Sequence, residues 1–407
     1  MSDKQVTVAI IGGGIGGLTA ALALLRAGCD VQVYERTVSL REVGAGIVIS
    51  PNATRILHWL GLAEPLARFG VQPVEWLQRR WDDGRVLLRA PLSESTIAAF
   101  GFPHYQSHRA DVQAVLANAL PPERLNTSHR LTRIIDNGDR VEAEFENGVR
   151  VSADMLIGAD GIHSTVRAAL FGPDNPRFTG CIAYRGLVPA ARLRHLDLDA
   201  TMEVWMGAGR HFVHYFVQNK QLINFGCFIE QDSWINESWT DSGNVADAIL
   251  AYQGWHPQVR AIIEAVDETF IWALFDRPPL ARWSVGRVTL LGDACHPMLP
   301  FVAQGAAQAI EDAACLAAIM RRIGGYGYNV PQALRLYECV RLPRTARIQA
   351  LATHHKQQFH LPDGPAQQER DAQLASGATG FALKAVAWIY GHDAADIDGA
   401  AMRLPAA

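Results

Sequence analysis

The 407-residue sequence predicts an α/β fold in which a parallel-sheet region is interleaved with an antiparallel sheet and followed by a helical C-terminal region. Three observations lead to this prediction. A β-branched strand, a glycine turn, an Ala/Leu-rich helix and a second strand open the chain, and this βαβ order predicts a parallel sheet. A later stretch alternates like antiparallel strands, and the chain then returns to a buried strand and a small-residue helix.

The elements of the N-terminal half follow in order. We expect a strand at 6–11, a helix that ends near Gly28, and a strand at 31–34. Residues 82–150 mix short strands, a helix at about 110–120 and turns such as Asn147-Gly148. These features indicate hairpins inserted into the parallel-sheet region.

In the C-terminal half, residues 181–229 are antiparallel in pattern, most clearly in HFVHYFVQ at 211–218. A helix near 245–265, an apolar strand at 288–291 and an Ala-rich helix from about Gln304 follow. Pro343 is expected to kink or restart the final helices. The expected division is residues 1–80, 100–180 and 284–330 for a discontinuous nucleotide-binding domain, 81–99 and 181–283 for a substrate-binding sheet domain, and 331–407 for C-terminal helices and a tail.

Composition limits the classes of protein. The 41 acidic and 37 basic residues are spread along the chain without a basic block, so nucleic acid is not an expected partner. Six isolated cysteines without a CxxC pair indicate free thiols and a cytoplasmic location. Residues 6–25 carry no charge, but their five glycines favour a buried strand–turn–helix over a membrane span or a signal peptide.

The glycine turn carries the first chemical signal. Gly12, Gly14 and Gly17 form GxGxxG between the expected strand and helix, and Glu35 ends the next strand. The glycines allow a tight turn, close approach of a pyrophosphate, and helix–sheet packing, while an acid at this place suits ribose hydroxyls. Glycines alone would also fit a turn without a ligand, but the four features together predict binding of NAD or FAD.

Two later stretches place small residues at strand ends. The stretch LIGADGIHSTVR at 156–167 contains Ser164, which is suited to cap a helix. A strand–turn–helix without a ligand would explain this cap and the glycines, but it would leave Asp160 without a role. In LLGDACHPMLPFVAQGAAQ at 290–308, Asp293 offers an acceptor for sugar-like hydroxyls, and small residues begin the next helix near an expected anionic ligand. Asp293, Cys295 and His296 lack the spacing of metal ligands, so no metal is expected. Cys295 is not an expected nucleophile, because a buried cysteine more often packs as a small hydrophobic residue.

These stretches resemble the paired DG and GD fingerprints of the class A flavin-dependent aromatic hydroxylases. Arg109 in SHRADVQAVL resembles an FAD-contacting arginine of that family, and REVGAGI at 41–47 resembles its loop beside the flavin. AYRGLVP at 183–189 and WIYGHDA at 388–394 are similar to the salicylate and hydroxybenzoate hydroxylases. The resemblance, from residue 6 to about 350, implies a Rossmann-like FAD-binding domain, FAD as cofactor, NADH or NADPH and O2 as co-substrates, a small aromatic acid as substrate, and a homodimer.

The resemblance and the glycine motif together give a set of expected FAD-binding residues. They are Gly12, Gly14, Gly17, Glu35, Arg36, Arg41, Gly46, Arg109, Leu131, Asp160, Asp293, Gly305 and Ala306.

The family's chemistry implies that NAD(P)H reduces FAD and that O2 forms a C4a-hydroperoxide, which attacks an activated phenolic ring. A group that takes the phenolic proton is therefore needed. A period of two places His211, Val213, Tyr215 and Val217 on one strand face, and we expect His211 and Tyr215 to contact the substrate and assist deprotonation. Their HxxxY spacing resembles hydroxybenzoate and hydroxynicotinate hydroxylases, although strands also carry such residues without function.

Val48, Val213, Pro300 and Phe301 are expected to line the substrate pocket. The hydroxynicotinate branch resembles this chain but carries histidines at the positions of Val48 and Phe301. Some 3-hydroxybenzoate 6-hydroxylases carry Gln at the position of Pro300. The stretch HPMLPFVAQGA is more similar to salicylate 1-hydroxylase. The favoured activity is thus oxidative decarboxylation of salicylate to catechol. The alternatives are 3-hydroxybenzoate 6-hydroxylase, 6-hydroxynicotinate 3-monooxygenase and, from another class, an FAD reductase or NAD-dependent dehydrogenase. The sequence does not identify the carboxylate-binding group, for which Arg185 is a candidate.

Overall fold

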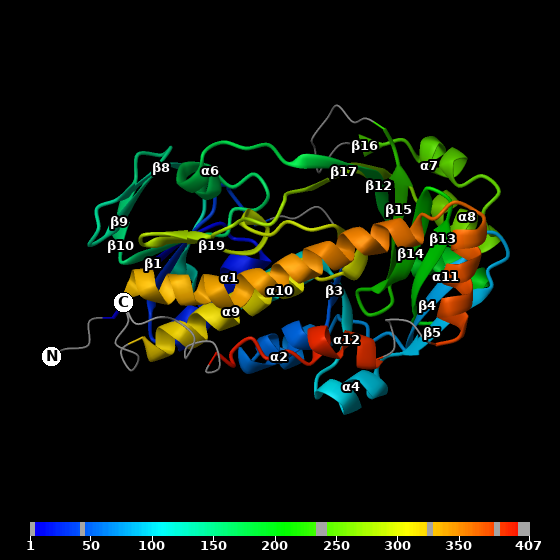
Figure 1. Cartoon of the computed structure of the whole chain (residues 1–407), viewed down its shortest axis with the longest axis horizontal. Helices are drawn as coiled ribbons and strands as arrows, with labels where there is room; N and C mark the ends of the chain where they lie inside the picture. Colours follow the sequence, from blue (N-terminus) through cyan, green and yellow to red (C-terminus); the bar gives the residue numbers. More distant parts are fainter. Residues whose placement is uncertain (1–4, 41–44, 233–241, 324–328, 378–382, 398–407) are drawn as a thin grey trace.

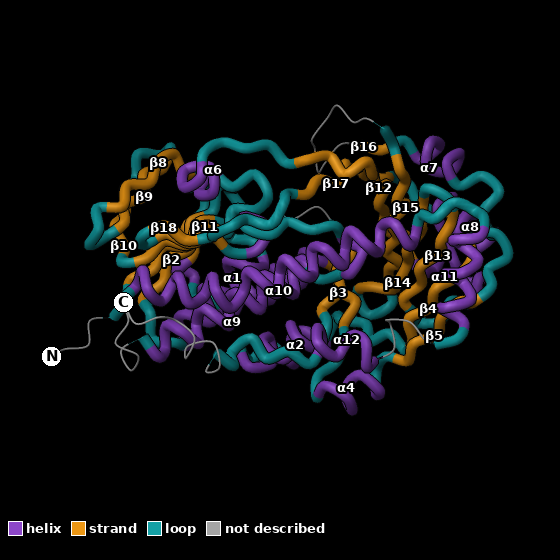
Figure 2. Tube along the Cα trace, viewed as in Figure 1, coloured by secondary structure: helices purple, strands orange, loops and turns teal. Residues whose placement is uncertain are grey.

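The protein is described by a computed structural model over residues 5–40, 45–232, 242–323, 329–377 and 383–397. Within these residues the α/β fold is confirmed, with a six-stranded sheet and an eight-stranded sheet as its two main layers of strands (Figures 1 and 2). A two-stranded ladder of β3 (Gly46–Ile49) and β6 (Tyr105–His108) and a three-stranded sheet complete the strands. The three-stranded sheet consists of β8 (Leu131–Asp136), β9 (Val141–Phe145) and β10 (Arg150–Ala153).

The six-stranded sheet contains the predicted βαβ unit. It is ordered β18-β19-β11-β1-β2-β7, and β1, β2, β7, β11 and β19 are parallel neighbours. Its elements are β1 (Thr7–Ile11), α1 (Ile15–Arg26), β2 (Asp30–Tyr34), β7 (Leu125–Asn126), β11 (Met155–Gly158), β18 (Ser284–Val285) and β19 (Val288–Leu290). Ile11 lies opposite Tyr34 and Gly158, so the loops that follow these strands meet at one edge of the sheet.

The eight-stranded sheet is mainly antiparallel and is ordered β16-β17-β12-β15-β14-β13-β4-β5. Its strands are β4 (Glu75–Arg80), β5 (Val86–Pro91), β12 (Arg177–Pro189), β13 (Met202–Gly207), β14 (Arg210–Val217), β15 (Leu222–Glu230), β16 (Ser242–Gly243) and β17 (Thr269–Asp276). β4 pairs with β13, although the sequence analysis assigned residues up to 80 to the nucleotide-binding domain. The pairing is non-local, so the pattern of β4 alone did not reveal its sheet.

One helical prediction needs correction, and another needs correction in part. The expected helix at 245–265 is two helices, α7 (Val245–Ala251) and α8 (Pro257–Glu264), because Gly254 has a φ of +82° and Pro257 begins a new helix. Of the kink or restart expected at Pro343, the restart is wrong, because α10 (Val330–Phe359) is one continuous helix through this residue.

The remaining helices cover the sheets or join them. They are α2 (Pro51–Trp59), α3 (Ala63–Ala67), α4 (Glu94–Phe100), α5 (Arg109–Ala119), α6 (Thr165–Phe171), α9 (Gly305–Arg322), α11 (Pro365–Ala375) and α12 (Leu383–Tyr390). In Figure 1, α10 runs beside α9 from the parallel sheet towards the large sheet, where it ends near β14 and β15. No described helix is long and apolar enough to cross a membrane.

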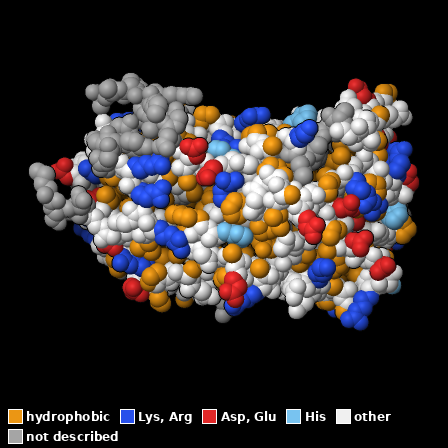
Figure 3. All heavy atoms as spheres, turned by 90° about the horizontal axis from the view of Figure 1, so that it is seen from below, with side chains coloured by type: hydrophobic (Ala, Val, Ile, Leu, Met, Phe, Trp, Pro, Cys, Tyr) orange, Lys and Arg blue, Asp and Glu red, His pale blue; other side chains and the backbone are white. Residues whose placement is uncertain are grey.

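Figure 3 shows the distribution of charge on one face of the molecule. Basic and acidic side chains are interspersed there with polar and hydrophobic ones. All six cysteines are free, and only Cys339 is exposed.

Candidate active site

The glycine turn after β1 has the geometry that a bound dinucleotide requires. Gly12 has a φ of +112°, and a Cβ at this position would lie 2.4 Å from the Ala159 carbonyl oxygen. A Cβ on Gly17 would lie 2.0 Å from the Gly12 carbonyl oxygen, so this glycine allows α1 to pack against the turn. A Cβ on Gly14 would meet no atom within 4 Å, which leaves the start of α1 open to a phosphate group.

Glu35 follows β2 and closes onto the same turn. Its Oε2 accepts a hydrogen bond from Gly13 N at 2.7 Å, and its Oε1 accepts from Thr37 N at 2.9 Å. Glu35, Arg36 and Leu131 all line the cavity that begins at the glycine turn. The predicted acid is therefore placed beside the phosphate loop, where ribose hydroxyls would lie.

The strand end after β11 has a structural task that the sequence analysis did not assign. The Asp160 carboxylate accepts hydrogen bonds from Ser164 Oγ and from Val166 N, the latter at 3.1 Å. The Ser164 hydroxyl in turn caps α6 by accepting from Arg167 N at 2.8 Å, as predicted. Burial raises the pKa of Asp160. Asp160 also lines the cavity, so it holds the start of α6 at the site's edge.

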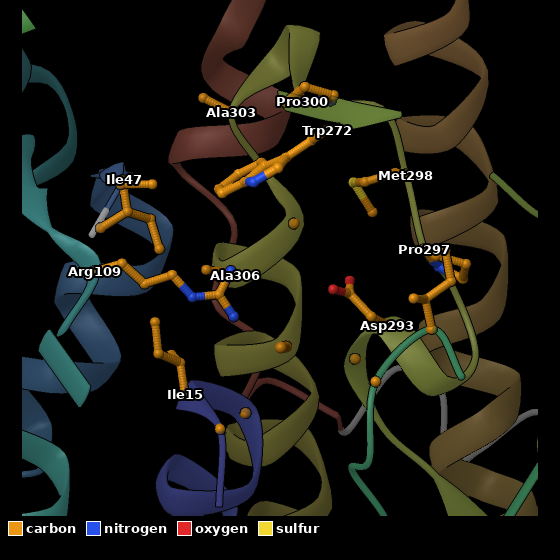
Figure 4. A pocket seen from close by; sticks show the side chains of 18 of the residues that line it. Ile15, Ile47, Arg109, Trp272, Asp293, Pro297, Met298, Pro300, Ala303 and Ala306 are labelled. Atoms are coloured by element: carbon orange, nitrogen blue, oxygen red, sulfur yellow. The ribbon is translucent and has the colours of Figure 1, made fainter. Parts of the chain in front are cut away.

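The second strand end carries Asp293 and leads to α9. In Figure 4 the Asp293 carboxylate points into the cavity, and the Arg109 side chain extends towards Ala306 in the first turn of α9. A Cβ on Gly305 would meet no atom within 4 Å, so the first turn of α9 is open to a planar ring. The positive end of this 18-residue helix suits an anionic ring edge.

One cavity of about 600 Å³ joins these features to the large sheet. Gly17 does not line it, and Arg41 lies outside the described residues. All the other predicted site residues line it: Gly12, Gly14, Glu35, Arg36, Gly46, Val48, Arg109, Leu131, Asp160, His211, Val213, Tyr215, Asp293, Pro300, Phe301, Gly305 and Ala306. The cavity extends from the dinucleotide turn past α9 to the strand face that carries the histidine and the tyrosine.

Strand register explains how the large sheet forms the far wall of the cavity. His211 lies opposite Phe228, Val213 opposite Gly226, and Tyr215 opposite Asn224. Because directly paired residues point to the same face, all six line the cavity. The other face of β14 carries Phe212, which packs with residues of α7 and α8 in a separate core.

His211 is held in an aromatic cage. Its ring stacks on Phe228 at 4.4 Å between centroids, and Phe301 meets it edge-on at 5.0 Å. Its Nδ1 is 2.6 Å from His360 Nε2. Burial and the neighbouring His360 hold the pKa of His211 well below its usual value, so the ring is neutral near pH 7. A neutral imidazole is able to accept a proton.

Tyr215 lies against the loop that precedes β3. A Cβ on Gly46 would lie 2.6 Å from the Tyr215 hydroxyl, and Gly46 N donates to Asn224 Oδ1 at 2.7 Å. Burial raises the pKa of Tyr215 to about 12, although the charge of Arg185 opposes this effect. The phenol of Tyr215 is therefore protonated at neutral pH and acts as a hydrogen-bond donor.

Arg185 on β12 lies on the same wall as Gly226, its partner in the ladder. Its guanidinium packs over Trp272 at 4.6 Å and donates from Nη2 to the Gly46 carbonyl oxygen at 3.1 Å. Its Nε is buried without a hydrogen-bond partner. Among the described residues, its hydrogen-bond and ring contacts are with the Gly46 carbonyl oxygen and Trp272, and none is with an Asp or Glu carboxylate. Burial lowers the pKa of Arg185. A cation in this setting favours an anionic ligand.

Several residues that line the cavity were not predicted from the sequence. Asn224, Phe228 and Trp272 come from strands β15 and β17, and Phe359 and Tyr390 from the C-terminal helices. The alternation in LINFGCFIE at 222–230 could have revealed the first two, because Asn224, Gly226 and Phe228 share one face. Tyr390 lies in the stretch at 388–394 that resembles the hydroxylases, whereas no local signal marks Trp272 and Phe359.

Cys295 and His296 belong to a buried hydrogen-bonded cluster outside the cavity. The side-chain atoms of Cys295, His296 and Asp312 that could ligate a metal lie within 4.8 Å of one another, but hydrogen bonds within the protein already occupy them. The Cys295 thiol donates to the Gly292 carbonyl oxygen, and burial raises its pKa well above its usual value. His296 Nε2 contacts Asp312 Oδ2 at 2.6 Å, and the other Asp312 oxygen accepts from Arg341 at 2.7 Å. Neither Cys295 nor His296 lines the cavity.

Comparison with known proteins identifies relatives that are named as monooxygenases of aromatic acids. The family described as "FAD binding domain" matches residues 5–351. The 3-amino-4-hydroxybenzoate 2-monooxygenase PtmB3 of Streptomyces platensis is 41% identical over 98% of both chains. The 6-hydroxynicotinate 3-monooxygenase of Pseudomonas fluorescens is 37% identical over 86% of this chain and 91% of its own.

Solved structures agree. A salicylate hydroxylase substrate complex has a TM-score of 0.83 at 26% identity and covers both chains completely, at 100% each. HpxO of Klebsiella pneumoniae, complexed with FAD and uric acid, has a TM-score of 0.82 at 26% identity and covers 98% of this chain and 96% of its own. The open Gly14 and Gly305 positions and the continuous cavity between them fit FAD. The chain therefore belongs to the class A FAD-dependent aromatic hydroxylases, which are flavoprotein monooxygenases that use O2 and NAD(P)H.

Proposed function

We propose that the enzyme hydroxylates a phenolic aromatic monocarboxylic acid, with 3-amino-4-hydroxybenzoate as the first candidate. One observation carries this proposal: the same wall of the cavity presents a buried arginine and a neutral histidine–tyrosine pair. The arginine suits a carboxylate, and the pair suits a phenol. Three relatives that span 97–98% of this chain, at 37–41% identity, are named for 3-amino-4-hydroxybenzoate.

Arg185 is on β12, and His211 and Tyr215 are on β14, with β15 between them. The Arg185 guanidinium and the Tyr215 hydroxyl both reach Gly46, so the cation lies beside the phenol of the pair. The choice between 3-amino-4-hydroxybenzoate and salicylate therefore rests on the relatives and on the substrate panel described below.

Salicylate, the substrate favoured by the sequence, is the second candidate. The likeness to the salicylate hydroxylase complex and the apolar side chains of Val48 and Phe301 support it. With salicylate, the acid would lose CO2 and yield catechol.

The protein's own groups have distinct roles in this proposal. Arg185 binds the carboxylate, His211 Nε2 accepts the phenolic proton, and Tyr215 donates a hydrogen bond to the resulting phenolate oxygen. Phe228, Phe301 and Trp272 enclose the ring and exclude water from it. When bound, FAD would take two electrons from NAD(P)H and activate O2, which supplies the oxygen atom that is transferred to the ring. Deprotonation raises the electron density of the ring that receives this atom.

The test combines the FAD-loaded protein with NADH, O2 and a panel of 3-amino-4-hydroxybenzoate, salicylate, 3-hydroxybenzoate and 6-hydroxynicotinate. Oxygen consumption is followed, and products are identified by mass spectrometry. The proposal predicts a hydroxylated product with the first acid; catechol from salicylate would favour the second candidate. NADH oxidation without any hydroxylated product would contradict both.

His211→Ala is expected to lower kcat by about 10²-fold or more, the range for a lost general base. Replacing the exposed His195 by alanine is the matched control and should leave kcat unchanged. An unchanged rate of hydroxylation by His211→Ala at saturating substrate would rule out the assigned role.

A further inference from the structure

His211 is the inner end of a line of hydrogen-bonded side chains that reaches the protein surface. His211 Nδ1 lies 2.6 Å from His360 Nε2, and His360 Nδ1 lies 3.1 Å from Glu230 Oε1. The two histidines are 1% and 5% exposed, whereas the Glu230 side chain is 45% exposed. His360 follows α10, and its carbonyl oxygen accepts from Gly209 N, which ties it to the turn before β14. The line thus joins the cavity to solvent.

The carboxylate at the outer end determines the direction of every hydrogen bond in the line. An ionised Glu230 only accepts, so His360 Nδ1 carries a proton and donates it. A neutral His360 then accepts at Nε2, which requires a proton on His211 Nδ1. His211 Nε2 is left with a lone pair, and among the described residues it has no hydrogen-bond partner. Each nitrogen in the line is therefore set to pass a proton outward.

We propose that His360 and Glu230 form a proton relay that carries the phenolic proton from His211 to solvent. The inference rests on the proposed role of His211 as the group that deprotonates the substrate. The phenolic O–H bond breaks as His211 Nε2 binds the proton, and the Nδ1 proton of His211 moves to His360 Nε2. The Nδ1 proton of His360 moves to Glu230 and from there to water. The reverse transfers return a proton to the product and restore the starting tautomers.

The groups that face the relay favour these protonation states. Burial lowers the pKa of His360, against the opposing effect of Glu230, and the hydrogen bond from His360 lowers the pKa of Glu230. Lys356 on α10 lies 3.8 Å from Glu230, and Arg210 on β14 also acts on His360. Phe228, Phe301 and Phe359 surround the His211 ring, so water does not readily replace the relay there. His360 and Glu230 are positioning residues, because neither lines the cavity.

The variants separate proton transfer from structural support. His360→Gln preserves hydrogen bonding but has no exchangeable ring proton, and Glu230→Gln ends the line in a neutral amide. His360→Ala opens a space that added imidazole can occupy. Glu264→Gln is the matched control, because Glu264 is a surface carboxylate of similar exposure, 44%, in an ion pair outside the relay.

Two measurements are made on the FAD-loaded protein. The first is the pH profile of kcat and KM for hydroxylation of 3-amino-4-hydroxybenzoate. The second is the rate at which bound 4-hydroxy-3-nitrobenzoate ionises after a rapid rise in pH, followed by its phenolate absorbance, which requires no turnover. We expect His360→Gln and Glu230→Gln to lower both kcat and the ionisation rate by about tenfold or more, with an unchanged KM. Imidazole should restore the ionisation rate of His360→Ala.

The outcomes are distinct. If His360→Gln ionises the probe as fast as the unmodified protein, or if Glu230→Gln behaves like Glu264→Gln, the relay is refuted and the proposed function is unaffected. If the probe ionises through His360 and Glu230 but no acid of the panel is hydroxylated, the relay stands as a proton path and the proposed function fails.

Discussion

Replacing Arg185 by methionine should weaken binding of the aromatic acid much more than binding of its neutral carboxamide. The guanidinium has no carboxylate partner among the described residues and has one unpaired buried nitrogen, so a substrate carboxylate would complete its contacts. Truncating one partner of a buried charged pair costs about 2–5 kcal/mol. Because Arg185 also donates to Gly46 and packs on Trp272, we expect the low end, about 2–3 kcal/mol, or about a 30- to 150-fold increase in Kd.

The assay is titration of flavin fluorescence with 4-hydroxybenzoate and with 4-hydroxybenzamide, in the FAD-loaded protein. Arg185→Lys retains the charge and should lose less affinity for the acid than Arg185→Met. Arg192→Met is the control, because Arg192 is exposed and pairs with Asp267 away from the cavity. An equal loss of affinity for the acid and the amide in Arg185→Met would refute the assignment of the carboxylate site.

Three further changes test the rest of the account. Glu35→Gln should raise the Kd of the apoprotein for FAD by about tenfold or more, since a charged hydrogen-bond acceptor is lost, and an unchanged Kd in a flavin titration would exclude Glu35 from the site. Cys295→Ala should retain the hydroxylation rate within about twofold, whereas a large loss would restore a catalytic role for the thiol. Arg341 and Arg344 hold the pKa of Glu311 at about 2, below its ordinary 4.5, so its stabilising contribution is present above pH 4.5 and is lost as the pH falls towards 2. Glu311→Gln should lower the free energy of unfolding at pH 7 by about 3–5 kcal/mol and so lower Tm. The Tm of this variant should also fall less steeply as the pH is lowered. Parallel curves of Tm against pH for the variant and the unmodified protein would contradict this.

The sequence predicted the elements whose signals are local. The glycine turn, the acid after β2 and the small residues at the start of α9 each lie within one strand–turn–helix, where residue type and spacing reflect the backbone directly. The period of two in β14 likewise placed His211 and Tyr215 on one face. The prediction of a homodimer remains a prediction.

The parts that could not be predicted depend on pairing between distant segments. β4 joins the large sheet by pairing with β13, more than a hundred residues later, and Asn224 reaches the site through its register with Tyr215. His360 lies 149 residues from His211 in sequence and meets it because α10 spans both sheets. Pro343 did not end α10, whose neighbouring Arg341 and Arg344 are anchored to Glu311 on α9. Local propensity carries no information about such contacts.

The structure of the FAD-loaded protein with bound 3-amino-4-hydroxybenzoate tests the central claim most directly. The account predicts the ring between Phe228 and the first turn of α9, with the phenolic oxygen within hydrogen-bond distance, about 2.6–3.2 Å, of His211 Nε2 and the carboxylate against Arg185. A phenolic oxygen directed away from β14, or a carboxylate held by another group while Arg185 remains unpaired, would contradict it.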